Sequence, residues 1–172
     1  MRLFTAICLD DEAKNALFLA EKAAENFSGG KFTLLENLHL TLVFIGETER
    51  EDEIKTALSE IEFPAFDFEI SGTGTFEKGI FWAGISENEY LRNLQKTVFE
   101  KLRETGFEPE EREFVPHITL ARKFRPAEDF PFGEIEKLLP ENRISAKRIS
   151  LMKSENENGV LRYTEICSVN LS

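Results

Sequence analysis

A chain of 172 residues with 41% hydrophobic and 31% charged residues has the composition of a soluble globular protein, with room for one well-packed domain. Its net charge of −11 argues against a broad grip on duplex nucleic acid, which needs many Lys and Arg contacts, but leaves room for a small phosphate site. No apolar run approaches the roughly 20 residues of a membrane span, and no signal peptide is recognisable. We therefore expect a cytoplasmic protein with no membrane contact.

In chain order, strand-like and helix-like segments alternate. Apolar or alternating runs predict strands at residues 2–9, 31–35, 38–45, 66–70, 73–76, 80–85, 114–121, 146–154 and 159–169. Apolar residues at three- and four-residue steps predict helices over residues 11–26, 48–61 and about 87–105, with a helical turn at 134–139. The remaining Phe-, Pro- and charge-rich residues between 123 and 143 predict an irregular excursion.

Several short signals predict where these elements begin and end. Asp10 is the expected N-cap of the first helix, and residues 28–30 (Ser-Gly-Gly) are expected to end it. Thr48 and Glu51 have the spacing of a capping box, in which two side chains close the start of a helix. Ser86 or Asn88 is expected to cap the third helix, and Lys78-Gly79 predicts a hairpin turn.

The only two histidines stand in matching phrases, His39-Leu40-Thr41-Leu42 and His117-Ile118-Thr119-Leu120. Side chains alternate faces along a strand, so each His and its Thr point the same way while the aliphatic residues enter the core. Either phrase alone fits an ordinary half-buried strand histidine. The matched pair favours a functional site.

The two phrases also end matching segments of the chain. Thirty-five positions separate Phe4 from His39, and thirty-six separate Phe81 from His117. Each interval holds a strand, a helix and a His-bearing strand, which indicates an internal repeat. Copies of this kind usually pack about a pseudo-two-fold axis, so we expect the histidines to face one another across a groove. We expect residues 1–172 to form a single domain of two pseudo-symmetric lobes sharing one active-site groove.

Two facing His/Thr pairs suit in-line phosphoryl transfer. One neutral and one protonated imidazole supply a general base and a general acid on opposite sides of a substrate, without fixing which is which. Thr41 and Thr119 can donate hydroxyl hydrogen bonds to the phosphate oxygens. Arg122 can add a charge-assisted contact, although a solvated arginine at a strand end is an equally good interpretation.

Other chemistries fit less well. The sequence has no Gly-x-Ser-x-Gly elbow, no Walker-type loop and no His-Glu-x-x-His, and residues 72–74 (Gly-Thr-Gly) predict a kink or bulge. Cys8 and Cys167 have no metal-ligand spacing and are expected to be buried, reduced thiols. Because neither histidine phrase carries an acid on its His face, we expect no metal and no cofactor.

These motifs together resemble the two-histidine (2H) phosphoesterase superfamily, and most closely its RNA 2',3'-cyclic phosphodiesterase group, also called 2'-5' RNA ligase or LigT-like proteins. The resemblance covers nearly the whole chain. It is carried by residues 2–6, 36–42, 44–47, 81–84, 106–109 and 116–122, with Ser154, Gly159 and Tyr163.

The resemblance implies an α+β fold of two lobes, with antiparallel sheets lining a central groove and helices outside. It implies metal-independent hydrolysis of RNA 2',3'-cyclic phosphate ends to 2'-phosphate ends, with a possible reverse ligation to 2'-5' linkages. By analogy, His39 is the proton donor and His117 the proton acceptor, with Thr41, Thr119 and Arg122 on the phosphate.

Two other functions remain open on the sequence. The same chemistry can act on a small cyclic nucleotide or an ADP-ribose cyclic phosphate, which the acidic surface favours. A module that binds RNA ends or a protein partner without catalysis is the alternative from another class. In the leading interpretation the partners are RNA ends or nucleotides bearing a 2',3'-cyclic phosphate, and we expect a monomer.

Overall fold

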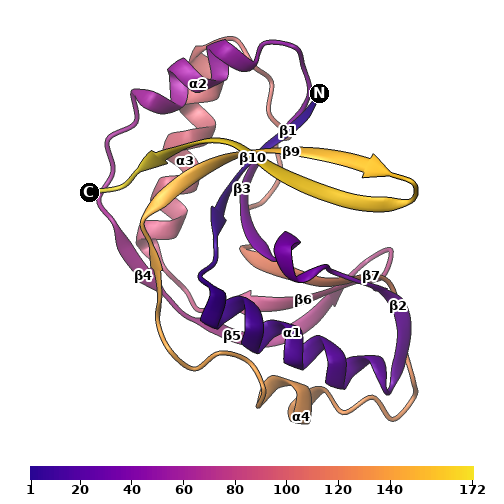
Figure 1. Cartoon of the computed structure of the whole chain (residues 1–172). Helices are drawn as coiled ribbons and strands as arrows, with labels where there is room; N and C mark the ends of the chain where they lie inside the picture. The colour runs from indigo at the N-terminus through magenta and orange to yellow at the C-terminus, as the bar shows by residue number, and fades with distance from the viewer.

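Two four-stranded antiparallel sheets carry the two histidine phrases, one phrase in each sheet (Figure 1). The computed structural model describes all residues from 1 to 172. In sheet A the strand order is β10-β9-β1-β3, formed by Val160–Asn170, Arg148–Glu157, Arg2–Cys8 and His39–Glu47. In sheet B the order is β2-β7-β6-β5, formed by Ser28–Phe32, His117–Pro126, Ile80–Ile85 and Ile70–Phe76. Two short strands, β4 (Phe66–Phe68) and β8 (Ile144–Ala146), pair separately.

Four α-helices lie outside these sheets, as the α+β prediction requires. They are α1 (Asp11–Glu25), α2 (Glu51–Ser59), α3 (Glu89–Glu104) and the short α4 (Phe132–Glu136), with a 3₁₀ turn η1 at Leu35–Asn37. No helix is both long enough and apolar enough to cross a membrane.

The predicted repeat corresponds to one local topology that occurs twice. β1 and β3 flank α1 and pair antiparallel, with Cys8 opposite His39. β6 and β7 flank α3 and pair in the same way, with Gly84 opposite His117. Along both phrases the aliphatic residues are buried and the His and Thr residues are half-buried, which confirms the alternation expected from the sequence.

Each long helix covers the sheet of the other repeat. α1 leaves sheet A after β1 but packs against β2 and β7 of sheet B, whereas α3 leaves sheet B and packs against β3 and α2 (Figure 1). As a result, one continuous cluster of 36 buried apolar residues includes side chains from both sheets. Strands β3 and β7 also contact one another, which brings the two histidine strands together.

We propose that residues 1–172 unfold as a single domain of two lobes, because neither sheet can keep its covering helix if the other lobe unfolds. Thermal or urea unfolding is expected to give one transition. Far-UV circular dichroism follows the whole chain, and fluorescence of Trp82, the single tryptophan, follows sheet B. Different midpoints for the two signals would contradict this prediction.

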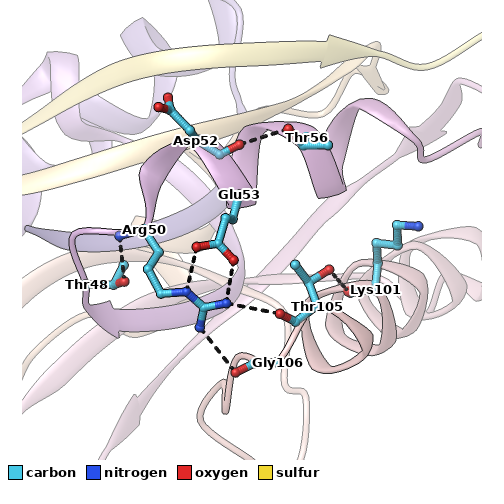
Figure 2. A network of polar contacts seen from close by, with 8 residues as sticks. All are labelled: Thr48, Arg50, Asp52, Glu53, Thr56, Lys101, Thr105 and Gly106. Carbon is cyan, nitrogen blue, oxygen red and sulfur yellow. Dashed lines mark hydrogen bonds and ion pairs between the residues drawn. The ribbon is translucent and has the colours of Figure 1, made fainter.

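The expected capping box at Thr48 and Glu51 is wrong. α2 begins only at Glu51, because the backbone N–H of Thr48 donates to the carbonyl of Met1 at 2.8 Å, directly beyond the last residue pair of β1 and β3. The Thr48 hydroxyl instead accepts from the backbone N–H of Arg50 at 3.0 Å (Figure 2). By contrast, Asp10 and Asn88 cap α1 and α3 as predicted, accepting from Ala13 and Leu91.

Arg50 joins the start of α2 to the end of α3 (Figure 2). Its guanidinium donates to Glu53 in a bidentate pair at 2.9 and 2.6 Å. It also donates to the carbonyls of Thr105 and Gly106, the two residues that directly follow α3. The same guanidinium lies 4.3 Å from the Phe107 ring centroid and so holds the start of the loop that leads to His117.

Two predicted strands that pair with one another, at 31–35 and 114–121, begin and end at other residues in the structure. Residues 28–30 form part of β2, which therefore begins before the predicted residue 31. The strand can run this close to β7 because Gly30, at φ +147°, has no side chain. A Cβ at this position would stand 3.1 Å from the Arg122 carbonyl oxygen. This pairing extends β7 to Pro126, beyond the predicted end at residue 121. At its other end β7 starts at His117 and not at residue 114, since Pro116 has no N–H to pair.

The turn and the bulge are confirmed, whereas the predicted burial of the two cysteines is wrong. Lys78 and Gly79, at φ values of 65° and 73°, form the tight turn between β5 and β6. The strand register shifts between Ile70 and Thr73, so residues 72–74 include the predicted bulge. Cys8 and Cys167 are free thiols, although both are partly exposed and not fully buried.

Candidate active site

His39 is held at the start of β3 by contacts to both ring nitrogens. Its Nδ1 lies 2.6 Å from the carbonyl oxygen of Asn37, and its Nε2 lies 2.7 Å from the hydroxyl of Thr41. Since a carbonyl only accepts, the proton of the neutral ring sits on Nδ1. The Nε2 lone pair then accepts from the Thr41 hydroxyl, so Nε2 is the basic atom of the neutral ring.

His117 has the same geometry at the start of β7. Its Nδ1 donates to the carbonyl of Val115 at 2.7 Å, again two residues upstream, and its Nε2 makes no hydrogen bond within the protein. The edge of an aromatic ring braces each imidazole. Tyr163 contacts His39 with ring centroids 5.1 Å apart, and Phe76 contacts His117 at 4.9 Å.

Both histidines open into one cavity of about 380 Å³ between the sheets. The cavity brings together all five residues predicted for the site, namely His39, Thr41, His117, Thr119 and Arg122. It is also lined by Arg2, Leu3, Phe4, Phe44, Ile45, Gly46, Glu108, Glu110, Ser154, Leu161 and Tyr163.

Arg122 reaches the cavity from β7 and is tied to sheet A. Its Nη2 donates to the phenol oxygen of Tyr163 on β10 at 3.1 Å. This contact excludes the interpretation of Arg122 as a solvated arginine at a strand end. A guanidinium held beside both His/Thr pairs is suited to bind an anion that lies between them.

Asn37 positions a large part of this site, and the sequence argument gave it no role of its own. It is buried, and its amide nitrogen donates to the carbonyl of Leu161 at 2.7 Å while its amide oxygen accepts from the N–H of Tyr163 at 3.2 Å. One residue therefore holds the His39 ring through its carbonyl and the Tyr163 strand through its side chain. The available signals were its place two residues before His39 and its position within the 36–42 stretch that carries the family resemblance.

Burial controls the protonation of both histidines. It lowers the pKa of His39 to about 4, chiefly because the charged ring loses water, with smaller contributions from the positive charges of Arg122 and His117. Burial also lowers the pKa of His117, with Arg112 and Arg122 acting in the same direction. Both rings are therefore mainly neutral at pH 7.

The fixed charges in the cavity are balanced. Arg2 and Arg122 supply positive charge, and Glu108 and Glu110 of the loop before β7 supply negative charge. No group of three or more His, Cys, Asp or Glu side chains in the chain is arranged to hold a metal ion. The cavity thus offers two imidazoles, two threonine hydroxyls and a tethered guanidinium as its reactive and anion-binding groups.

Comparisons with known proteins place the chain among relatives of known activity. Residues 10–158 match the 2'-5' RNA ligase superfamily. An RNA 2',3'-cyclic phosphodiesterase of Thermotoga maritima is 32% identical, over 95% of this chain and 100% of its own length. A protein of the same name from Archaeoglobus fulgidus is 35% identical, over 71% of this chain and 72% of its own length.

Solved structures agree with this placement. The structure of E. coli LigT without ligand has a TM-score of 0.83 at 25% identity, covering 99% of this chain and 97% of LigT. LigT complexed with 3'-AMP gives a TM-score of 0.82 at 25% identity, covering 99% and 98%. The family match, the curated relatives and the fold confirm the resemblance carried by the two histidine phrases, and the chain belongs to the 2'-5' RNA ligase superfamily.

Proposed function

We propose that this protein hydrolyses RNA 2',3'-cyclic phosphate ends to 2'-phosphate ends by general acid-base catalysis between His39 and His117, without a metal ion. The observation that carries the proposal is the shared cavity, into which both imidazoles open with Nδ1 bound to a backbone carbonyl. That arrangement leaves neither Nε2 atom bound to the backbone: Nε2 of His117 has no partner within the protein, and Nε2 of His39 contacts only the Thr41 hydroxyl.

In the proposed reaction, His117 Nε2 takes a proton from water as the water oxygen attacks phosphorus. The bond between phosphorus and O3' breaks, and His39 Nε2 gives its proton to the departing O3'. The product carries a 2'-phosphate and a free 3'-hydroxyl. Thr41, Thr119 and Arg122 bind the non-bridging oxygens, where negative charge develops.

The depressed pKa of His39 has to be reconciled with its role as proton donor. A cyclic phosphodiester carries one negative charge, and an anion near an imidazole raises its pKa. Substrate binding therefore favours the protonated ring that the leaving oxygen requires. In the same complex Thr41 turns from His39 Nε2 to a phosphate oxygen, which frees this nitrogen to face O3'.

The relatives support an RNA end as the substrate, since the proteins of T. maritima and A. fulgidus are named RNA 2',3'-cyclic phosphodiesterases and LigT has been crystallised with 3'-AMP. The cavity of about 380 Å³ is also compatible with a single terminal nucleotide. A monomeric state and a cytoplasmic location stay predictions.

The proposal is tested by incubating the protein with an oligoribonucleotide that ends in a 2',3'-cyclic phosphate, in the presence of EDTA. The expected product is the 2'-phosphate alone, and a cyclic mononucleotide compared side by side reports how far the rest of the RNA contributes. Formation of a 3'-phosphate would show that O2', and not O3', is the leaving group. Tight binding of the oligonucleotide without turnover would indicate a non-catalytic binding module instead.

The pH profile of kcat/KM is expected to be bell-shaped with its maximum below pH 6.5, the ordinary pKa of histidine. Both histidine pKa values are lowered, that of His39 to about 4, and kcat/KM reports the free enzyme. Activity falls at higher pH as the acid loses its proton, and at lower pH as the base gains one. A maximum above pH 7, measured with the cyclic-phosphate oligonucleotide, would contradict this prediction.

A further inference from the structure

The face of sheet B that carries His117 and Thr119 also carries Trp82. In the β6–β7 pairing Trp82 lies opposite Thr119, and Gly84 lies opposite His117. Residues paired across antiparallel strands present their side chains on the same face. The half-buried indole of Trp82 therefore stands beside the second His/Thr pair.

The two repeats differ at this position. In sheet A the residue opposite Thr41 is Ala6, whereas in sheet B the residue opposite Thr119 is Trp82. The Trp82 ring lies so closely over the strand next to it that a Cβ on Gly74 would stand 2.3 Å from the ring. Phe76 continues the aromatic surface, with ring centroids 5.2 Å from Trp82 and 4.9 Å from His117. An aromatic surface therefore lies next to His117.

A second cavity of about 380 Å³ opens beside this surface. Trp82 and Gly84 line one side, and Val115 and Pro116, which directly precede His117, line another. Its charged groups are Glu87, Glu113 and Arg92, and Arg92 is already paired with Glu87 at 2.5 Å. This lining does not favour a phosphate, but it is compatible with an uncharged base and sugar.

We infer that the surface formed by Phe76 and Trp82, with the cavity beside it, binds the 5'-terminal nucleoside of a second RNA whose 5'-hydroxyl replaces water as the nucleophile. This inference rests on the proposed function, in which His117 is the base. The attacking oxygen then lies on the side of His117, and so must the nucleoside that carries it. Aromatic side chains stack on any base.

The step balances without another reactant. The 5'-oxygen attacks phosphorus of the 2',3'-cyclic phosphate, and its proton passes to His117 Nε2. The bond between phosphorus and O3' breaks, and O3' receives a proton from His39. The product is a 2'-5' phosphodiester with a free 3'-hydroxyl on the donor RNA, and one proton has moved from His39 to His117.

The test measures how one cyclic-phosphate donor is partitioned between water and a 5'-hydroxyl oligoribonucleotide in excess. Trp82→Leu removes the aromatic face and Trp82→Phe retains part of it. The Trp82 indole N–H has no acceptor within the protein, so neither change breaks an internal hydrogen bond. Phe44→Leu is the matched variant in the first cavity, on the side of His39. Circular dichroism and thermal unfolding check that each variant is folded.

Ligation by Trp82→Leu is expected to fall about tenfold or more relative to hydrolysis, in line with the effect of losing one base stack, with Trp82→Phe in between. Phe44→Leu is expected to slow both reactions equally. Equal loss of both reactions in Trp82→Leu would overturn the inference, and so would a change of partition in Phe44→Leu alone. Hydrolysis without any ligation in the unmodified protein would also overturn it while leaving the proposed function intact, whereas absence of hydrolysis would reject the proposed function itself.

Discussion

His39→Ala and His117→Ala are each expected to lower kcat by about 10²- to 10⁴-fold in hydrolysis of a cyclic-phosphate oligonucleotide, because each removes one of the two proton-transfer groups. KM is expected to change less, since Thr41, Thr119 and Arg122 still line the cavity. Steady-state kinetics with a fluorescently labelled oligonucleotide measures both constants. Full activity in either variant would rule out the two-histidine mechanism.

A variant that lacks both histidines tests whether His39 and His117 act in the same step or independently. Because both proton transfers belong to one in-line displacement, His39→Ala combined with His117→Ala is expected to cost little more than the worse single change. The control is Lys137→Ala, which alters an exposed side chain of the loop after α4 that is paired only with Glu134. This variant should keep the activity of the unmodified protein. If the fold-loss of kcat in the double variant equals the product of the two single fold-losses, the histidines act in separate steps.

Much of the site could be predicted because its signal is local. A strand places His and Thr on one face whatever the rest of the chain does, so the phrases at 39 and 117 predicted by spacing alone four side chains that the structure brings to one cavity. The nearly equal intervals before them predicted that the two strands occur in equivalent surroundings. Both histidines indeed lie opposite small residues, Cys8 and Gly84, in equivalent antiparallel pairs.

Contacts between distant segments were not predictable in this way. The Asn37 side chain meets β10 across 124 residues of sequence, and nothing in the local pattern indicates this contact. The exchange of α1 and α3 between the sheets depends likewise on which apolar faces fit together. The capping box failed because the pairing of Thr48 with Met1 takes precedence over the local preference for a helix start.

Glu21 shows how burial can override the pattern of a single helix. A charged residue on α1 is expected to face water, yet only 1% of Glu21 is exposed and its carboxyl oxygens have no hydrogen-bond partner. Loss of water raises its pKa to about 9, and the charge of Glu25 adds to this effect. The side chain is therefore buried as a neutral acid at pH 7, which residue type alone does not reveal.

Arg122→Met is expected to lower kcat/KM about 10²-fold, which is the usual cost of removing one preorganised donor to an oxyanion. Arg122→Lys keeps the charge but loses the planar fork, so an intermediate loss is expected. Tyr163→Phe removes the phenol oxygen that holds the guanidinium and is expected to cause a smaller loss than Arg122→Met. Activity of Arg122→Met within about threefold of the unmodified protein would contradict a role in phosphate binding.

The pH profile separates electrostatic loss in Arg122→Met from simple misfolding. Arg122 is among the positive charges that lower the pKa values of both histidines. Removing it should therefore raise both pKa values and shift the kcat/KM maximum to higher pH, whereas Arg122→Lys should leave the maximum nearly in place. A partly unfolded variant would lose activity at every pH without this shift. We expect Arg122→Met to lose activity and to move the kcat/KM maximum to higher pH, and Arg122→Lys to leave the maximum in place. This result would place the charge of Arg122 beside both proton-transfer groups.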